Sequence, residues 1–266
     1  MLKDITLGQY YPGNSLVHNL DPRIKIISTI LFVCAVFLVK NFIGYAFVIA
    51  SVLGVVSMSK IKLSLVLKGV KPLAFIIVFT SLLNLFLTQG EIIWKMGFLK
   101  ITKEGLFLAI TMSLRLILLV MGTSILTFTT SPIALTDGIE KLLSPFSKVG
   151  IPAHEIAMMM SIALRFIPTL VEETDKIMKA QMSRGADFES GNILSRAKAM
   201  VPILVPLFIG SFRRADELAT AMECRCYHGG EGRTRLKELK IKNRDIVALI
   251  TVLAFVTAII VLNVIF

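Results

Sequence analysis

Motifs of the common enzyme classes are missing from this chain of 266 residues. It has no G-x-x-x-x-G-K-[ST] loop for nucleotide phosphates, no H-E-x-x-H zinc motif and no G-x-S-x-G nucleophile elbow. It also lacks the paired-aspartate motif of a membrane transferase. The carboxylates stand without a histidine or nucleophile arranged for catalysis. The chain is therefore predicted to be no enzyme by itself, and no cofactor is predicted.

Cysteine is scarce, with only Cys34, Cys224 and Cys226. Three cysteines do not form a disulfide framework, which favours a reducing compartment. Cys224 and Cys226 alternate with other residues up to His228, a pattern that invites a metal interpretation. Structural zinc needs four ligands with wider cysteine spacing, and no second ligand pair follows. We therefore favour small residues at a helix end, with no metal site.

Residues 1–22 have no apolar core of a signal peptide, so no cleaved leader is expected. What is abundant is apolar sequence: 55% of residues are hydrophobic and the mean hydropathy is +0.77. This is too apolar for an ordinary soluble domain. The apolar residues gather in blocks, as a bilayer requires, and predict five membrane spans. The blocks are 24–39, 42–58, 72–88, 106–130 and 246–266.

The formal net charge of +11 lies mainly in the loops between these blocks, which favours a membrane surface over nucleic acid as its counterpart. Residues 59–71 contain four lysines and no acidic residue. Basic loops stay on the cytoplasmic side of a membrane. The N-terminus, 59–71 and 131–244 are therefore predicted inside, and the turn at 40–41 and the segment 89–105 outside.

The long polar segment between the last two spans has helical periodicity. Apolar residues recur at helical spacing over 153–182 and again over 197–222. A helix of 30 residues reaches about 45 Å, so such helices can cross one another. We expect Pro168, Pro202 and Pro206 to kink or break them. The apolar run from Met200 to Phe212 is expected to pack against the membrane bundle or the interface.

The predicted fold class is thus an all-α membrane protein with about five transmembrane helices and a cytoplasmic region of long crossing helices. Residues 1–130 hold the N-terminal segment and four spans. Residues 131–244 form the cytoplasmic helical region, and 245–266 the last span.

Arg184 and Arg225 each end one of the amphipathic patterns and are soon followed by glycine, Gly185 or Gly229. A cation near a helix C-terminus complements the helix dipole, and glycine caps the end. The planar guanidinium is equally suited to pairing with acidic side chains or carbonyls of a partner. Both interpretations remain open from spacing alone.

Arg115 lies inside the fourth predicted span, where a charge is costly. It either belongs to a solute path or pairs with a polar group inside the protein. We favour the second, because one charge makes a poor path.

Three separated segments resemble the T components of energy-coupling factor (ECF) transporters. They are residues 8–25 (GQYYPGNSLVHNLDPRIK), 181–189 (QMSRGADFE) and 212–233 (FRRADELATAMECRCYHGGEGR). The order of elements matches that family over essentially the whole chain.

The resemblance implies a membrane scaffold of a prokaryotic plasma membrane that joins two ABC-type ATPases to a substrate-binding S component for vitamin or micronutrient uptake. In that family two Ala-Arg-Gly-like motifs end the coupling helices, and their arginines contact the ATPases. By motif position these arginines are Arg184 and Arg225. Ser183 and Cys224 stand where the motif has alanine, and Cys226 where the second motif has the glycine that Gly185 supplies in the first.

Two other function classes fit the sequence less well. A self-sufficient channel or secondary carrier would need a polar path through the spans, and only Arg115 with scattered Ser, Thr and Asn residues offers one. A membrane-embedded enzyme lacks a catalytic constellation.

Overall fold

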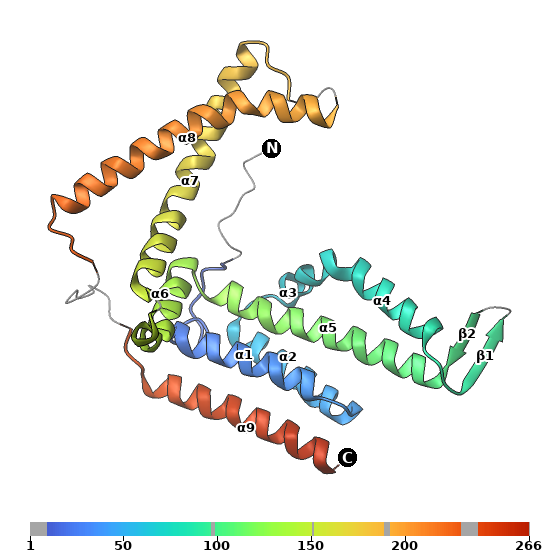
Figure 1. The fold of residues 1–266 in the computed structure, drawn as a ribbon. Coiled ribbons are helices and arrows are strands. Elements are labelled where there is room, and N and C mark those ends of the chain that lie inside the picture. Colours follow the sequence, from blue (N-terminus) through green and yellow to red (C-terminus); the bar gives the residue numbers. More distant parts are fainter. Residues whose placement is uncertain (1–9, 97–98, 151, 189–191, 230–238, 266) are drawn as a thin grey trace. The chain divides into compact units, whose positions relative to one another are not determined.

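The computed structural model describes residues 10–96, 99–150, 152–188, 192–229 and 239–265. They form two compact units. The bundle unit comprises Gln9–Gly138 and Leu239–Phe266, and the long-helix unit includes Ile139–Glu238. The second unit is thus inserted in sequence between two parts of the first (Figure 1).

The bundle unit is built of apolar helices with one small hairpin. Its elements in chain order are α1 (Pro22–Leu38), α2 (Phe42–Ser59), α3 (Leu63–Val70), the 3₁₀ turn η1 (Lys71–Leu73), α4 (Ala74–Leu87), β1 (Ile92–Met96), β2 (Leu99–Thr102), α5 (Lys103–Thr129), the first part of α6 (Pro132–Leu143), and α9 (Asn243–Ile265). Strands β1 and β2 pair antiparallel within the segment 89–105, where no strand was predicted.

The core of this unit gathers around one face of α2. Tyr45, Val48, Val52 and Val56 recur at helical spacing and are all buried. They belong to one cluster with side chains of α1, α5 and α9. Gly122 of α5 permits the close approach of α1, since a Cβ atom there would overlap the Phe32 ring.

Within the part of the chain that the structure describes, five helical segments are long and apolar enough to cross a membrane, judged by length and composition. Four overlap predicted blocks: α2, the run Leu63–Leu87, α5 and α9. The block 24–39 forms α1, which at 17 residues is shorter than these segments. The fifth is α7 (Ala153–Ser183), which qualifies through its apolar first half although it was predicted outside the bilayer. The all-α membrane class is confirmed.

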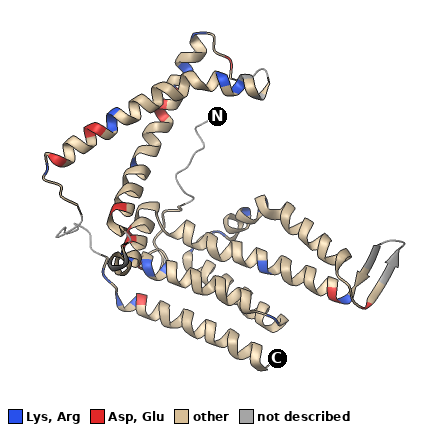
Figure 2. Ribbon diagram, viewed as in Figure 1, with Lys and Arg blue, Asp and Glu red and all other residues tan. Residues whose placement is uncertain are grey.

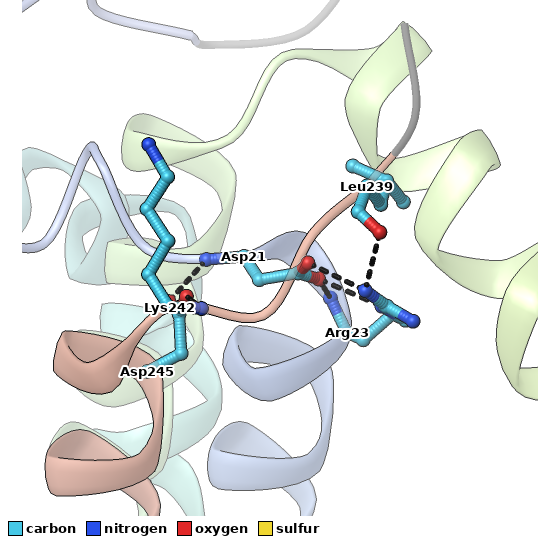
Figure 3. Close-up of polar contacts among 5 residues, drawn as sticks. All are labelled: Asp21, Arg23, Leu239, Lys242 and Asp245. Carbon is cyan, nitrogen blue, oxygen red and sulfur yellow. Dashed lines mark hydrogen bonds and ion pairs between the residues drawn. The ribbon is translucent and has the colours of Figure 1, made fainter.

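Helix α1 lies beside α9, and a polar clasp joins their N-terminal ends (Figure 3). The carboxylate of Asp245 accepts hydrogen bonds from the backbone N–H groups of Asp21 and Lys242, both at 2.8 Å. Asp21 is the N-cap of α1 and pairs with Arg23 through Nε at 3.0 Å and Nη2 at 2.8 Å. Arg23 Nη2 also donates to the Leu239 carbonyl at 3.1 Å. Both carboxylates are buried, and each has partners.

The pKa of Asp21 lies below its ordinary value. Burial alone would raise it, but hydrogen bonds and the charge of Arg23 outweigh that effect. The carboxylate is therefore held ionised in the folded protein.

The other ends of α1 and α9 are also joined. Asn263 Nδ2 donates to the Leu38 carbonyl at 2.6 Å, and Asn263 Oδ1 accepts from the Lys40 N–H at 3.3 Å. Asp21 and Asp245 join the N-terminal ends of α1 and α9, and Leu38 and Asn263 join their C-terminal ends. The two helices therefore run parallel. Helix α1 therefore accompanies α9 over nearly the whole length of that candidate span.

Arg115 pairs within the bundle unit. Its Nη2 donates to the Val39 carbonyl at 3.1 Å, at the C-terminal end of α1, and its guanidinium lies 5.8 Å from the centre of the Phe37 ring. A cation at a helix C-terminus satisfies free carbonyls and complements the dipole. This geometry fits internal pairing, the favoured of the two interpretations.

The N-terminal segment packs against the end of α5. The Tyr11 N–H donates to the Phe128 carbonyl at 3.0 Å, and buried Lys25 donates to the carbonyls of His18 and Thr129 at 3.0 and 2.8 Å. The first of the three family-like segments thus has a structural role in holding α1 against α5.

The long-helix unit contains the rest of α6, the 3₁₀ turn η2 (Ser144–Val149), α7 and α8 (Ile193–Glu223). Both long helices have 31 residues. Of the two expected effects of the prolines, a break is wrong, because α7 runs on through Pro168 and α8 through Pro202 and Pro206, and a kink stays a prediction. Each proline removes one backbone hydrogen bond, and the neighbouring turns of so long a helix keep theirs.

Candidate functional site

Helices α7 and α8 cross within the long-helix unit and run in opposite directions (Figure 1). Arg214 pairs with Glu173 at 2.5 Å, in the second half of both helices. Toward the end of α7, Gln181 Nε2 donates to the Pro202 carbonyl at 3.5 Å. At its start, His154 meets Tyr227, which follows α8. The C-terminal ends of the two helices therefore lie at opposite ends of the pair.

Helix α7 ends in a Schellman motif. The N–H of Ala186 donates to the Gln181 carbonyl and that of Gly185 to the Met182 carbonyl, both at 3.0 Å. Gly185 has a φ of +87°, the left-handed conformation that the motif requires. Arg184 is the C-cap residue, and its side chain is exposed.

Helix α8 ends in the same motif. The N–H of Tyr227 donates to the Met222 carbonyl at 3.1 Å, and that of Cys226 to the Glu223 carbonyl at 2.9 Å. Arg225, also exposed, thus occupies the place that Arg184 has in α7. The residue in the left-handed conformation is Cys226, with a φ of +56°. The prediction that Gly229 caps this helix is therefore wrong, since Gly229 lies three residues beyond Cys226.

The remaining predicted site residues are neighbours of these arginines. Ser183 Oγ donates to the Lys179 carbonyl at 3.1 Å, and Cys224 and Cys226 are free and exposed. The structure groups Ser183 and Gly185 with Arg184, and Cys224 and Cys226 with Arg225. Gln181, close to Arg184 at the end of α7, contacts Pro202 of α8. The 23 residues from Pro202 to Arg225 extend about 35 Å along α8, and this length separates the two groups. Among the described residues, no group of three His, Cys, Asp or Glu side chains could hold a metal ion.

A cleft of about 850 Å³ opens beside Arg225. Its lining comes from the first half of α7 and the end of α8: Met158, Ser161, Ile162, Arg165, Phe166, Leu218, Met222, Arg225, Cys226, Tyr227, His228 and Gly229. Arg165 was not singled out from the sequence. Helical spacing places Arg165 on the same face of α7 as Ile162. It does not predict that Arg225, 60 positions later, lines the same cleft.

A chain of three side chains fixes the loop after Arg225. His154 Nδ1 lies 3.2 Å from Glu140 Oε1, and His154 Nε2 lies 3.4 Å from the Tyr227 hydroxyl. With Glu140 ionised, Nδ1 donates to it and Nε2 accepts from the phenol. The contact joins α6, the start of α7 and the capping motif of α8.

The apolar run of α8 is largely exposed within the structure. Val201, Val205 and Phe212 have relative exposures of 50%, 51% and 68%, whereas Ile203 is buried. The expected packing of this run against the membrane bundle or the interface stays a prediction. A surface of this kind is typical of a partner or membrane contact. Charged residues of both signs occur along α7 and α8, as Figure 2 shows.

Comparison with known proteins decides the family. A family profile described as "Cobalt transport protein" (CbiQ) matches residues 13–236. The chain is 57% identical over 258 residues to the "Energy-coupling factor transporter transmembrane protein EcfT" of Clostridium kluyveri, and the match covers 96% of both chains. The chain belongs to the EcfT family. A relative of the same name from Thermosediminibacter oceani is 59% identical over 249 residues, 94% of both chains.

The EcfT family also includes a Bacillus subtilis protein to which the chain is 52% identical over 258 residues, 96% of this chain and 97% of that one. The resemblance drawn from three segments is confirmed. Members of the EcfT family are named as transmembrane proteins of a transporter, and the candidate spans agree with a multi-pass membrane protein.

Proposed function

We propose that the chain is the scaffold and coupling subunit of an ECF importer. In this role it binds two separate ABC-type ATPase subunits through its long-helix unit and transmits their ATP-driven motion to a substrate-binding S component. The bundle unit spans the plasma membrane, with the N-terminus and the long helices in the cytoplasm. The transported solute is a vitamin or another micronutrient.

One observation carries this proposal: Arg184 and Arg225 occupy the same position in the same motif, directly before its left-handed residue, and each is exposed at the end of a 31-residue helix. A residue at this position leads the chain out of the helix, so its side chain is available to a partner. Two such ends about 35 Å apart can serve two partner subunits. The guanidinium fork pairs well with carboxylates and carbonyls.

The helix pair can also transmit motion. Glu173 and Arg214 join α7 and α8 near their crossing, and α8 closely approaches α7 there at Gly210. A displacement at one end of a rigid helix that is held at a crossing moves the other end. Coupled helices of this kind are a known means of passing conformational change between sites.

Charge reversal at the two arginines tests the proposal. We expect Arg184→Glu and Arg225→Glu each to weaken binding of the purified ATPase subunits at least about tenfold, because each replaces a favourable ion pair by repulsion. Membrane insertion should be unchanged, since both side chains are exposed. Binding is measured by pull-down and biosensor titration, and uptake in reconstituted vesicles with the ATPases and an S component.

The matched control is Arg213→Glu, which reverses an exposed arginine in α8 away from both helix ends. Its ATPase binding should equal that of the unchanged chain. Normal ATPase binding and normal uptake in both Arg184→Glu and Arg225→Glu would refute the coupling function. Solute flux through the chain alone in liposomes would instead support a stand-alone channel or carrier.

A further inference from the structure

The cleft beside the end of α8 holds two guanidinium groups. Arg225 comes from the capping motif of α8 and Arg165 from the first half of α7, and both side chains are exposed. Of the described residues that line this cleft, none is acidic. The walls therefore present two fixed positive charges with no carboxylate between them to neutralise them. Such a pair strongly favours an anionic group that can accept several N–H bonds.

The rest of the lining is mainly apolar. Met158, Ile162, Phe166, Leu218 and Met222 form the walls between the two arginines. An apolar wall lowers the local dielectric and strengthens an ion pair that forms inside the cleft. Methionine side chains adapt to the shape of an incoming partner. This combination suits an acidic side chain carried on a protein surface.

The two arginines line the same cleft because side-chain contacts fix the loop after α8. Tyr227 follows Arg225 by two residues and contacts His154, which pairs with Glu140. His154 and Arg165 belong to the same helix, α7. The loop that carries Arg225 is thus tied to the element that carries Arg165. Arg225 and Arg165 therefore line one cleft from two elements that are held together.

We propose that this cleft binds an acidic side chain of one ATPase partner through Arg165 and Arg225 jointly. The proposal rests on the coupling function above and adds Arg165 as a residue of the docking site. Arg184 lies at the opposite end of the helix pair and is not among the residues that line this cleft. The two ATPase contacts are therefore unequal: one is made by two arginines in a cleft, and the other centres on Arg184.

Neutral substitutions of Arg165 test this proposal. We expect Arg165→Gln to weaken binding of the ATPase that contacts Arg225 about tenfold or more, because a charge-assisted hydrogen-bond partner is lost. Arg165→Lys keeps the charge without the fork and should lie between Arg165→Gln and the unchanged chain. Arg213→Gln, outside the cleft, should bind normally. Titrations use the purified full chain in a neutral detergent.

A double substitution shows whether the two arginines share one acidic group. If they do, the loss in Arg165→Gln/Arg225→Gln is smaller than the product of the single losses. Independent contacts would multiply and would overturn the joint site. Unchanged elution and thermal unfolding of each variant, with partial recovery in Arg165→Lys, separate lost contacts from misfolding.

Two further outcomes would overturn the proposal. In the first, Arg165→Gln binds the ATPases normally while Arg225→Glu does not; the coupling function then stands and only the role of Arg165 fails. In the second, Arg165→Gln loses affinity for vesicles of anionic phosphatidylglycerol while its ATPase binding is unchanged. The cleft then binds a lipid headgroup. Normal ATPase binding by both charge-reversal variants is the separate result that refutes the coupling function itself.

Discussion

Arg184 and Arg225 owe their placement to the residue that follows each of them. Gly185 and Cys226 both adopt the left-handed conformation that closes a Schellman motif. Glycine does so without steric cost, whereas a residue with a Cβ atom is strained there by about 1 kcal/mol or more. The second helix end therefore carries strain that the first does not.

Exchanging these residue types measures that strain. We expect Cys226→Gly to stabilise the end of α8 by about 1 kcal/mol, and Gly185→Ala to destabilise the end of α7 by a similar amount. A Cβ atom at Gly185 meets open space, so the effect there is one of backbone conformation alone. Hydrogen exchange of the amides at residues 185–186 and 226–227 reports each end separately. Slower exchange in Gly185→Ala would contradict the interpretation.

At the scale of the element, the parallel pair of α1 and α9 stands out because its contacts are polar at both ends and apolar between them. Asp245 and Asn263 of α9 bind backbone groups at the two ends of α1. Ile259, between them, is buried in the core cluster. Ends fixed by hydrogen bonds set the register, and the apolar middle supplies the packing energy.

Removal of the Asp245 carboxylate tests the clasp. We expect Asp245→Ala to lower the free energy of unfolding by about 2–3 kcal/mol, because it leaves the N–H groups of Asp21 and Lys242 without their acceptor. The neighbouring substitution Arg244→Ala changes an exposed side chain and should have little effect. Thermal unfolding of the purified chain in detergent provides the measurement. Equal midpoints for the two variants would show that the clasp does not contribute to stability.

The elements were predictable from sequence to the extent that they follow a local pattern. Helical periodicity located α7 and α8, and apolar blocks located α2, α5 and α9. The hairpin β1–β2 was missed although Gly97 stands between its two short strands, and the cap at Cys226 was missed because no glycine stands at that position. Arg165 was missed for another reason: its significance depends on a crossing of two helices, and no local pattern encodes that contact.

For the whole molecule, the division into two units follows the distribution of charge. Charged residues of the bundle unit lie mostly at helix ends, whereas α7 and α8 carry them along their length (Figure 2). Basic residues in 59–71 predict which side of the membrane each loop faces. The proposed function requires the long-helix unit to lie in the cytoplasm.

Thiol labelling tests this orientation. Cys224 and Cys226 are exposed and report on the long-helix unit in a Cys34→Ser chain. In sealed right-side-out vesicles we expect a membrane-impermeant maleimide to label them only after permeabilisation. An Asn41→Cys reporter in a chain free of other cysteines should be labelled at once. The reverse pattern would overturn the predicted topology.

The pairing of α1 with α9 also bears on biosynthesis. Helix α1 leaves the ribosome before α9, and this partner, which fixes both its ends, follows about 200 residues later. Until then the Asp21 N–H and the Leu38 carbonyl lack their α9 acceptor and donor. The bundle is thus completed only after the intervening unit has been synthesised. A chain truncated before α9 exposes α1 without its partner helix, and membrane proteases and chaperones can recognise it.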